Sequence, residues 1–168
     1  MPTASASTQA LVDALLAATP HAEWRTTYTA DQVGIDFVNR YGFIELYGPE
    51  GHYVSEQSRA FIGYWGNQLY YPPHSHEAEE LYYIVAGEAL FAVDDDAVQS
   101  SALQNSALRN PALRNPALRN RDSQLRSPED SQTHSTCQPH SMTTQDSAVL
   151  CLVLWRGAGL AGSARLND

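Results

Sequence analysis

The chain has 168 residues, enough for one domain with a proper core, and its apolar content of 43% is near the globular norm. Its formal net charge of −9 argues against nucleic acid or an anionic membrane as a partner. The two cysteines, Cys137 and Cys151, make neither a disulfide framework nor a zinc knuckle. No apolar run approaches the roughly 20 residues that span a bilayer, and the N-terminus is a poor secretory signal, so we expect a cytoplasmic protein.

Residues 1–40 predict a helical N-terminal extension. In residues 8–18 the apolar side chains recur at helical spacing, and Pro20 ends the helix. A second, weaker helical stretch covers residues 29–40, where Asp31 is a candidate cap. We interpret both stretches as packing or dimer elements rather than as parts of a reaction centre.

From residue 41 the sequence changes to short apolar and aromatic runs that Gly and Pro interrupt. Many short strands without intervening helices favour an antiparallel sandwich or barrel. We expect residues 41–160 to form this domain and residues 161–168 to be a C-terminal tail. The candidate strands are residues 43–48, 59–66, 69–76, 80–93 and 148–157.

Residues 101–120 read SALQN-SALRN-PALRN-PALRN, four tandem copies of a five-residue unit. Five is the period of neither a helix nor a strand, and Pro111 and Pro116 break any helix. We interpret the block at about residues 101–126 as a low-complexity insertion in a hairpin of the domain. A basic binding loop is the alternative.

The strongest chemical signal is the pattern H-x-H-x3-E formed by His74, His76 and Glu80. Side chains alternate along a strand, so the two histidines share a face, and Glu80 returns to it if the chain turns once into another strand. Two imidazoles and a carboxylate are ligands of first-row transition metals. The alternative is a solvated loop rich in His and Glu, but the flanking residues are strongly β-forming and favour a buried site.

A third imidazole would complete a site with three histidines and one glutamate. His134 and His140 are both available downstream, and we favour His140 because Met142 and a predicted strand follow it. Such a ligand set admits one divalent transition-metal ion, Fe, Mn, Zn, Ni or Cu, and does not select among them.

The segment from His74 to Gly87 resembles the first metal motif of the cupin superfamily, and His140 fits the ligand of its second motif. More narrowly, residues 63–91, 139–144 and 150–157 resemble the bacterial cupin dimethylsulfoniopropionate (DMSP) lyases of the DddL, DddQ and DddW type. The resemblance implies an all-β cupin double-stranded β-helix, a jelly-roll-like barrel, with short N-terminal helices. It also implies a carbon–sulfur lyase that splits DMSP into dimethyl sulfide and acrylate, and the cupin habit suggests a homodimer.

The resemblance assigns the removal of the substrate's Cα proton to Tyr82, which lies two residues beyond Glu80 and therefore on the same strand face. Tyr71 resembles a second aromatic residue of the site, either a substrate-positioning hydroxyl or an auxiliary base. Trp155 and Trp65 are candidates to face the sulfonium through cation–π attraction. For each aromatic residue the alternative is core packing.

The sequence departs from the family around the second motif. Glu129 stands where the family tends to have the Gly of a Pro-Gly-Asp turn, and a Glu at positive φ costs about 1 kcal/mol. The stretch before His140 also lacks the usual Gly. Two other functions therefore stay open: another small-molecule cupin enzyme, an isomerase or dioxygenase of a carboxylated substrate, or a degenerate cupin that binds a metal or ligand without turnover.

Overall fold

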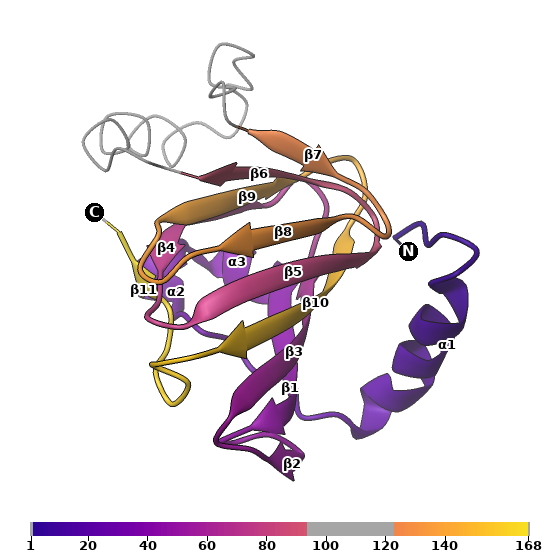
Figure 1. Ribbon diagram of the computed structural model, residues 1–168. Helices are drawn as coiled ribbons and strands as arrows, with labels where there is room; N and C mark the ends of the chain where they lie inside the picture. The colour runs from indigo at the N-terminus through magenta and orange to yellow at the C-terminus, as the bar shows by residue number, and fades with distance from the viewer. Residues whose placement is uncertain (1, 94–122, 168) are drawn as a thin grey trace.

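A computed structural model describes residues 2–93 and 123–167, which form two β-sheets packed face to face (Figure 1). The first sheet has the strand order β2-β1-β3-β10-β5-β8, and the second has the order β11-β4-β9-β6-β7. All pairings are antiparallel except the short one between β1 and β2. This two-layer arrangement is jelly-roll-like, so the predicted all-β class is confirmed.

The strands of both sheets are short. Those of the first sheet are β1 (Tyr41–Gly48), β2 (Tyr53–Val54), β3 (Ser58–Trp65), β5 (Glu79–Ala86), β8 (Ser131–His134) and β10 (Val149–Arg156). Those of the second sheet are β4 (Tyr70–Ser75), β6 (Ala89–Val93), β7 (Gln124–Arg126), β9 (His140–Thr144) and β11 (Arg165–Leu166). Each predicted strand run is confirmed, the longest as the hairpin β5–β6. The predicted runs do not include β2, β7, β8, β9 and β11, because strands of two to five residues show too little alternation.

The helices precede the sheets, as expected. They are α1 (Gln9–Ala18), the 3₁₀ turn η1 (Thr19–His21), α2 (Ala30–Val33) and α3 (Ile35–Arg40). The second predicted stretch is broken at Gly34, whose φ of 87° interrupts the helix. The expected cap was wrong, because Thr29 and Gln32 form a capping box at α2 and Asp31 lies inside the first turn. Dimerisation through these helices stays a prediction.

Alternation along β10 separates two apolar clusters. Cys151 and Val153 face the second sheet and join Phe91 in the core between the sheets. Leu150 faces outward, where Val12 of α1 covers it. The central strands therefore have both faces buried, and polar side chains that point between the sheets need partners there.

The tandem repeat at residues 101–120 lies outside the described residues, and the expected domain limits stay predictions. Strands β6 and β7, on either side of the repeat, pair with each other, Phe91 opposite Gln124. Within the described ranges, no helix is both long and apolar enough to cross a membrane.

The turn that leads into β8 contains Glu129 at φ 77°. The backbone N–H of Glu129 donates to the carbonyl of Ile84 at 2.9 Å, and its carboxylate accepts a hydrogen bond from Ser7. The left-handed conformation predicted for this residue is therefore present. Cys137, in the Gly-less turn before β9, also has a positive φ, of 58°.

The strain at Glu129 leads to a prediction that compares two variants. Glu129→Gly and Glu129→Ala both lose the bond from Ser7, but only Ala keeps a Cβ at positive φ. We expect the free energy of unfolding of the Gly variant to exceed that of the Ala variant by about 1 kcal/mol in urea titrations. Equal values would show that the turn tolerates a side chain without strain.

Candidate active site

The carboxylate of Glu80, in β5, is the centre of a buried cluster of rings. Its Oε2 lies 3.1 Å from Nδ1 of His134, 3.1 Å from Nε2 of His76 and 3.0 Å from Nε2 of His140. Its Oε1 accepts a hydrogen bond of 2.7 Å from the indole N–H of Trp155. All five side chains are buried. One carboxylate therefore has four ring nitrogens around it, away from solvent.

These groups come from both sheets, and strand register brings them together. In the first sheet, Glu80 lies opposite His134 of β8 on one side and opposite Trp155 of β10 on the other. In the second sheet, His74 of β4 lies opposite His140 of β9. His76 follows β4 in the single turn that leads into β5, the geometry expected from the spacing of the motif. The cluster thus joins the two layers.

Three of the four histidines are oriented in the same way. Each directs Nδ1 to a backbone carbonyl two residues away: His74 to Pro72 at 2.9 Å, His76 to Ala78 at 2.8 Å and His140 to Gln138 at 2.8 Å. A carbonyl at Nδ1 fixes the tautomer in which Nε2 keeps its lone pair, the arrangement usual for histidines that bind metals. His134 differs, because its Nδ1 is bonded to Glu80.

The donor set can be tested against a metal ion. Ligand atoms of His76, Glu80 and His140 all lie within 4.8 Å of one another. Among the described residues, the buried Nε2 atoms of both histidines have no hydrogen-bond partner, and the same holds for Nε2 of His134. An unsatisfied buried nitrogen costs about 1–3 kcal/mol, which a bound cation offsets. These residues therefore fit a metal ion and form a candidate metal-binding site.

His74 lies beside this group of three. Its ring centre is 4.2 Å from that of His140 and 6.4 Å from that of His76. On its other side, the ring of Tyr71 stacks on it at 4.0 Å. Burial and then the neighbouring His140 hold the pKa of His74 well below its usual value, so its ring is neutral.

The environment of Glu80 favours its charged form. Burial by itself raises the pKa of Glu80, but hydrogen bonding, first of all that from His134, outweighs burial and holds that pKa well below its ordinary value. The charged carboxylate is thus available to a cation at neutral pH.

A cavity of about 230 Å³ opens beside the cluster. His74, His76 and Glu80 are among the residues that line it. All four predicted aromatic residues line it too: Trp65, Tyr71, Tyr82 and Trp155. The structure thus brings the predicted site residues to one place, although His140 contacts Glu80 without being among the residues that line the cavity.

The two tyrosines are buried phenols close to the histidines. The ring of Tyr82 lies 5.6 Å from that of His134 and 6.4 Å from that of His140. Burial, followed by the charge of Glu80, raises the pKa of Tyr82 well above its ordinary value. Burial likewise raises the pKa of Tyr71. Without a cation nearby, both hydroxyls therefore stay protonated.

The two tryptophans differ in their surroundings. Trp155 donates to Glu80 and stacks on His76 at 4.2 Å with an interplanar angle of 29°, so it contacts two candidate ligands. Trp65 lies between the tyrosines, 5.8 Å from Tyr71 and 6.0 Å from Tyr82. Both rings leave part of their surface to the cavity.

Sequence reasoning missed two charged residues of the cavity wall. Arg59 of β3 and Glu45 of β1 both line the cavity and are buried. A signal was present, because each is a charged residue inside an otherwise apolar strand run, and a buried charge implies a partner. The sequence could not show that Arg59 and Glu45 are partners, since the two residues are on different strands.

Comparison with known proteins places the chain in a family. Its residues 1–120 match the family model described as dimethylsulfoniopropionate lyase. A curated relative, the dimethylsulfoniopropionate lyase DddQ of Ruegeria pomeroyi, is 34% identical over 148 residues, 88% of this chain and 61% of the relative. The chain thus spans less than two thirds of the length of that relative.

Solved structures agree with this match. A chain from the crystal structures of the DMSP lyases RdDddP and RnDddQII is 40% identical, with a TM-score of 0.81 over 99% of this chain and 73% of that one. An oxalate decarboxylase of Lactobacillus farciminis is 15% identical, with a TM-score of 0.56 over 86% of this chain and 33% of its own. The second likeness shows the shared fold alone.

The different orientations of the histidines lead to a prediction. We expect His140→Ala to lower the affinity for a divalent metal by more than the roughly 10–100-fold that loss of an outer-shell partner costs. His134→Ala is the matched control and stays within that range, because it removes only a hydrogen bond to Glu80. Metal titration of both folded variants measures this difference. A larger loss in His134→Ala would make His134 the ligand.

Proposed function

Because the chain belongs to the dimethylsulfoniopropionate lyase family, we propose that it is a metal-dependent carbon–sulfur lyase that splits DMSP into dimethyl sulfide and acrylate. The observation that carries the proposal is the convergence of Glu80 and Nε2-presenting histidines beside a small cavity lined by tyrosines. A wall rich in metal ligands suits the carboxylate of a small substrate, and aromatic walls suit its sulfonium.

We propose His74, His76, Glu80 and His140 as the ligands of one divalent transition-metal ion, Fe, Mn, Zn, Ni or Cu. When bound, the ion supplies Lewis-acid stabilisation of the negative charge that builds up on the substrate carboxylate during proton removal. His134 orients Glu80 through its Nδ1–H in this proposal, and it is not itself a ligand.

The elimination needs a base at Cα and a leaving group at Cβ. In our proposal Tyr82 reacts as its phenolate, the form that a cation held by the neighbouring ligands would favour by lowering the pKa of the phenol. The phenolate oxygen accepts the Cα proton, the electron pair of that C–H bond forms the double bond of acrylate, and the Cβ–S bond breaks with its electron pair going to sulfur. The sulfonium thereby becomes neutral dimethyl sulfide. The support for Tyr82 is its place in the cavity wall beside the histidines.

The other aromatic residues bind and orient the substrate in this proposal. Tyr71, stacked on His74, positions the substrate or serves as an auxiliary base. Trp155 and Trp65 face the sulfonium with their ring surfaces, where cation–π attraction is worth about 0.5–2 kcal/mol. Together the walls exclude water from the reacting carbons.

The direct test is release of dimethyl sulfide into the headspace over DMSP. We expect metal-free protein to be inactive and at least one metal among Fe, Mn, Zn, Ni and Cu to restore release, with acrylate formed in equal amount. The proposal would be overturned if folded protein with its full complement of metal released no dimethyl sulfide with any of these five metals. Binding of DMSP without turnover would then indicate the degenerate binder.

Tyr82→Phe tests the base. We expect metal content and folding to be retained while kcat falls by about 10²–10⁴-fold, the usual contribution of general-base catalysis. Tyr83→Phe is the matched control, because it removes the same hydroxyl one residue along β5, on the outward face of the sheet. Unchanged turnover in Tyr82→Phe would remove Tyr82 from the mechanism.

A further inference from the structure

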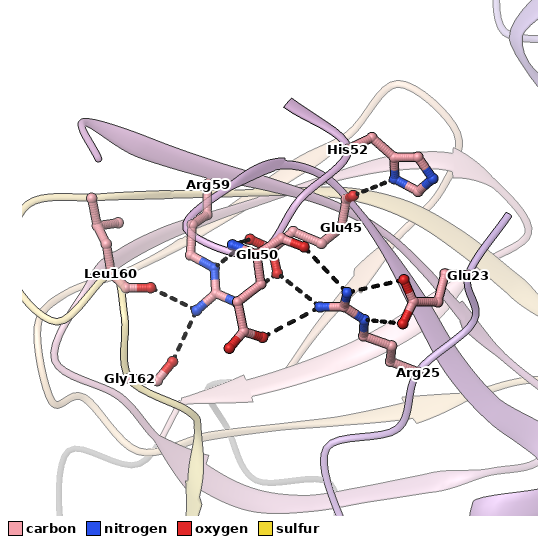
Figure 2. A network of polar contacts seen from close by, with 8 residues as sticks. All are labelled: Glu23, Arg25, Glu45, Glu50, His52, Arg59, Leu160 and Gly162. Carbon is pink, nitrogen blue, oxygen red and sulfur yellow. Dashed lines mark hydrogen bonds and ion pairs between the residues drawn. The ribbon is translucent and has the colours of Figure 1, made fainter. Parts of the chain in front are cut away.

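A buried ion pair that is separate from the metal-binding cluster lies in the wall of the same cavity. Glu45 accepts hydrogen bonds from Arg59 through both carboxylate oxygens, Nε to Oε1 at 3.2 Å and Nη2 to Oε2 at 2.7 Å. The Glu45 side chain is 1% exposed and that of Arg59 is 9% exposed. Figure 2 shows this pair at the centre of a polar network.

The same guanidinium reaches the C-terminal segment. Nη1 of Arg59 donates to the carbonyl of Leu160 at 2.6 Å and to that of Gly162 at 3.0 Å (Figure 2). These carbonyls belong to the strap, which we define as residues 157–164, between the end of β10 and the start of β11. Gly162, Ser163 and Ala164 of the strap line the cavity. Arg59 therefore fixes the main chain of one cavity wall.

Arg59 also contacts the aromatic wall. Its guanidinium lies 4.9 Å from the ring centre of Phe61 and 5.6 Å from that of Trp155. Trp155 in turn contacts Glu80 and His76. Arg59 thus contacts both the strap and Trp155, and Trp155 in turn contacts two of the proposed metal ligands.

The neighbouring Arg25 does not fill this role. It lies 3.7 Å from Glu45, but it is bonded mainly to Glu23 and Glu50, which are 69% and 74% exposed. Exposed pairs of this kind contribute about 0–1 kcal/mol. No bond from Arg25 to the strap is present among the described residues, so Arg59 alone connects Glu45 to the strap.

Stability by itself does not account for the pair, because apolar residues in place of a buried ion pair are often as stable or more so. We propose that Arg59 is a positioning residue that holds the strap closed against the cavity and so sets how tightly a small substrate is bound. The kinetic part of this proposal rests on the proposed lyase function, while the structural part does not.

The test uses the full chain with metal bound. Arg59→Met alone leaves the Glu45 charge buried and threatens folding, so the test variant is the double substitution Glu45→Gln with Arg59→Met, which removes both charges. We expect amide hydrogen exchange in residues 158–164 to speed up by about tenfold, as lost hydrogen bonds lower the free energy of local opening. Metal content stays unchanged, since no proposed ligand is altered.

Kinetics then separates positioning from general damage. We expect the KM for DMSP to rise by about tenfold in the double variant while kcat changes less than about threefold, because the strap shapes binding and the reacting groups stay in place. Arg59→Lys is expected to lie between wild type and the double variant, since an ammonium keeps the charge but not the fork of donors. Arg156→Met is the matched control: Arg156 forms an exposed pair with Glu79, and its loss leaves both readouts unchanged.

Unchanged exchange in the strap of the folded double variant would overturn the proposal. Amide hydrogen exchange can be measured without any enzymatic turnover, so it tests the structural part of the proposal even if the wild-type protein releases no dimethyl sulfide. With an active wild type, a drop in kcat at constant KM would also overturn it.

Discussion

The buried carboxylate of Glu80 constrains the whole arrangement. A charge between two sheets costs several kcal/mol unless it is paired, and here its partners are His134, His76, His140 and Trp155. They come from β8, the turn after β4, β9 and β10, so a one-residue slip of any of these strands would point its ring to the other face. The register of both sheets and the geometry of the site therefore specify each other.

Local rules were sufficient for the part of the site that lies in one short stretch. The alternation of side chains along a strand placed His74 and His76 on one face. The even spacing from His76 to Glu80, with a single turn between them, returned Glu80 to that face. Tyr82 is two residues beyond Glu80 and therefore lies beside these ligands. His140 lies far along the chain, and no periodicity spans the repeat before it. Its position follows from the pairing of β9 with β4, a long-range contact that the sequence signals only through its resemblance to a family.

The remaining features depend on contacts that no spacing rule encodes. Both downstream histidines reach Glu80, because β8 neighbours β5 and β9 neighbours β4, and only the hydrogen bond at Nδ1 tells them apart. The hydrogen bond from Arg59 to the carbonyl of Leu160 in the strap joins residues 101 positions apart in the chain. A charged residue in an apolar run signals burial, but its partner is fixed by which strands meet in the fold.

The hydrogen bonds of Arg59 limit what this residue can offer to a carboxylate ligand in the cavity. Its guanidinium has five N–H groups, and four hydrogen bonds to Glu45, Leu160 and Gly162 occupy most of them. Its charge is also balanced by Glu45. Although it is a cation in the cavity wall, it therefore offers little to an anion. In the proposed lyase, the negative end of the substrate is drawn to the metal ion that the histidines and Glu80 would hold, and the ion pair of Arg59 and Glu45 acts on the substrate through the shape of the wall.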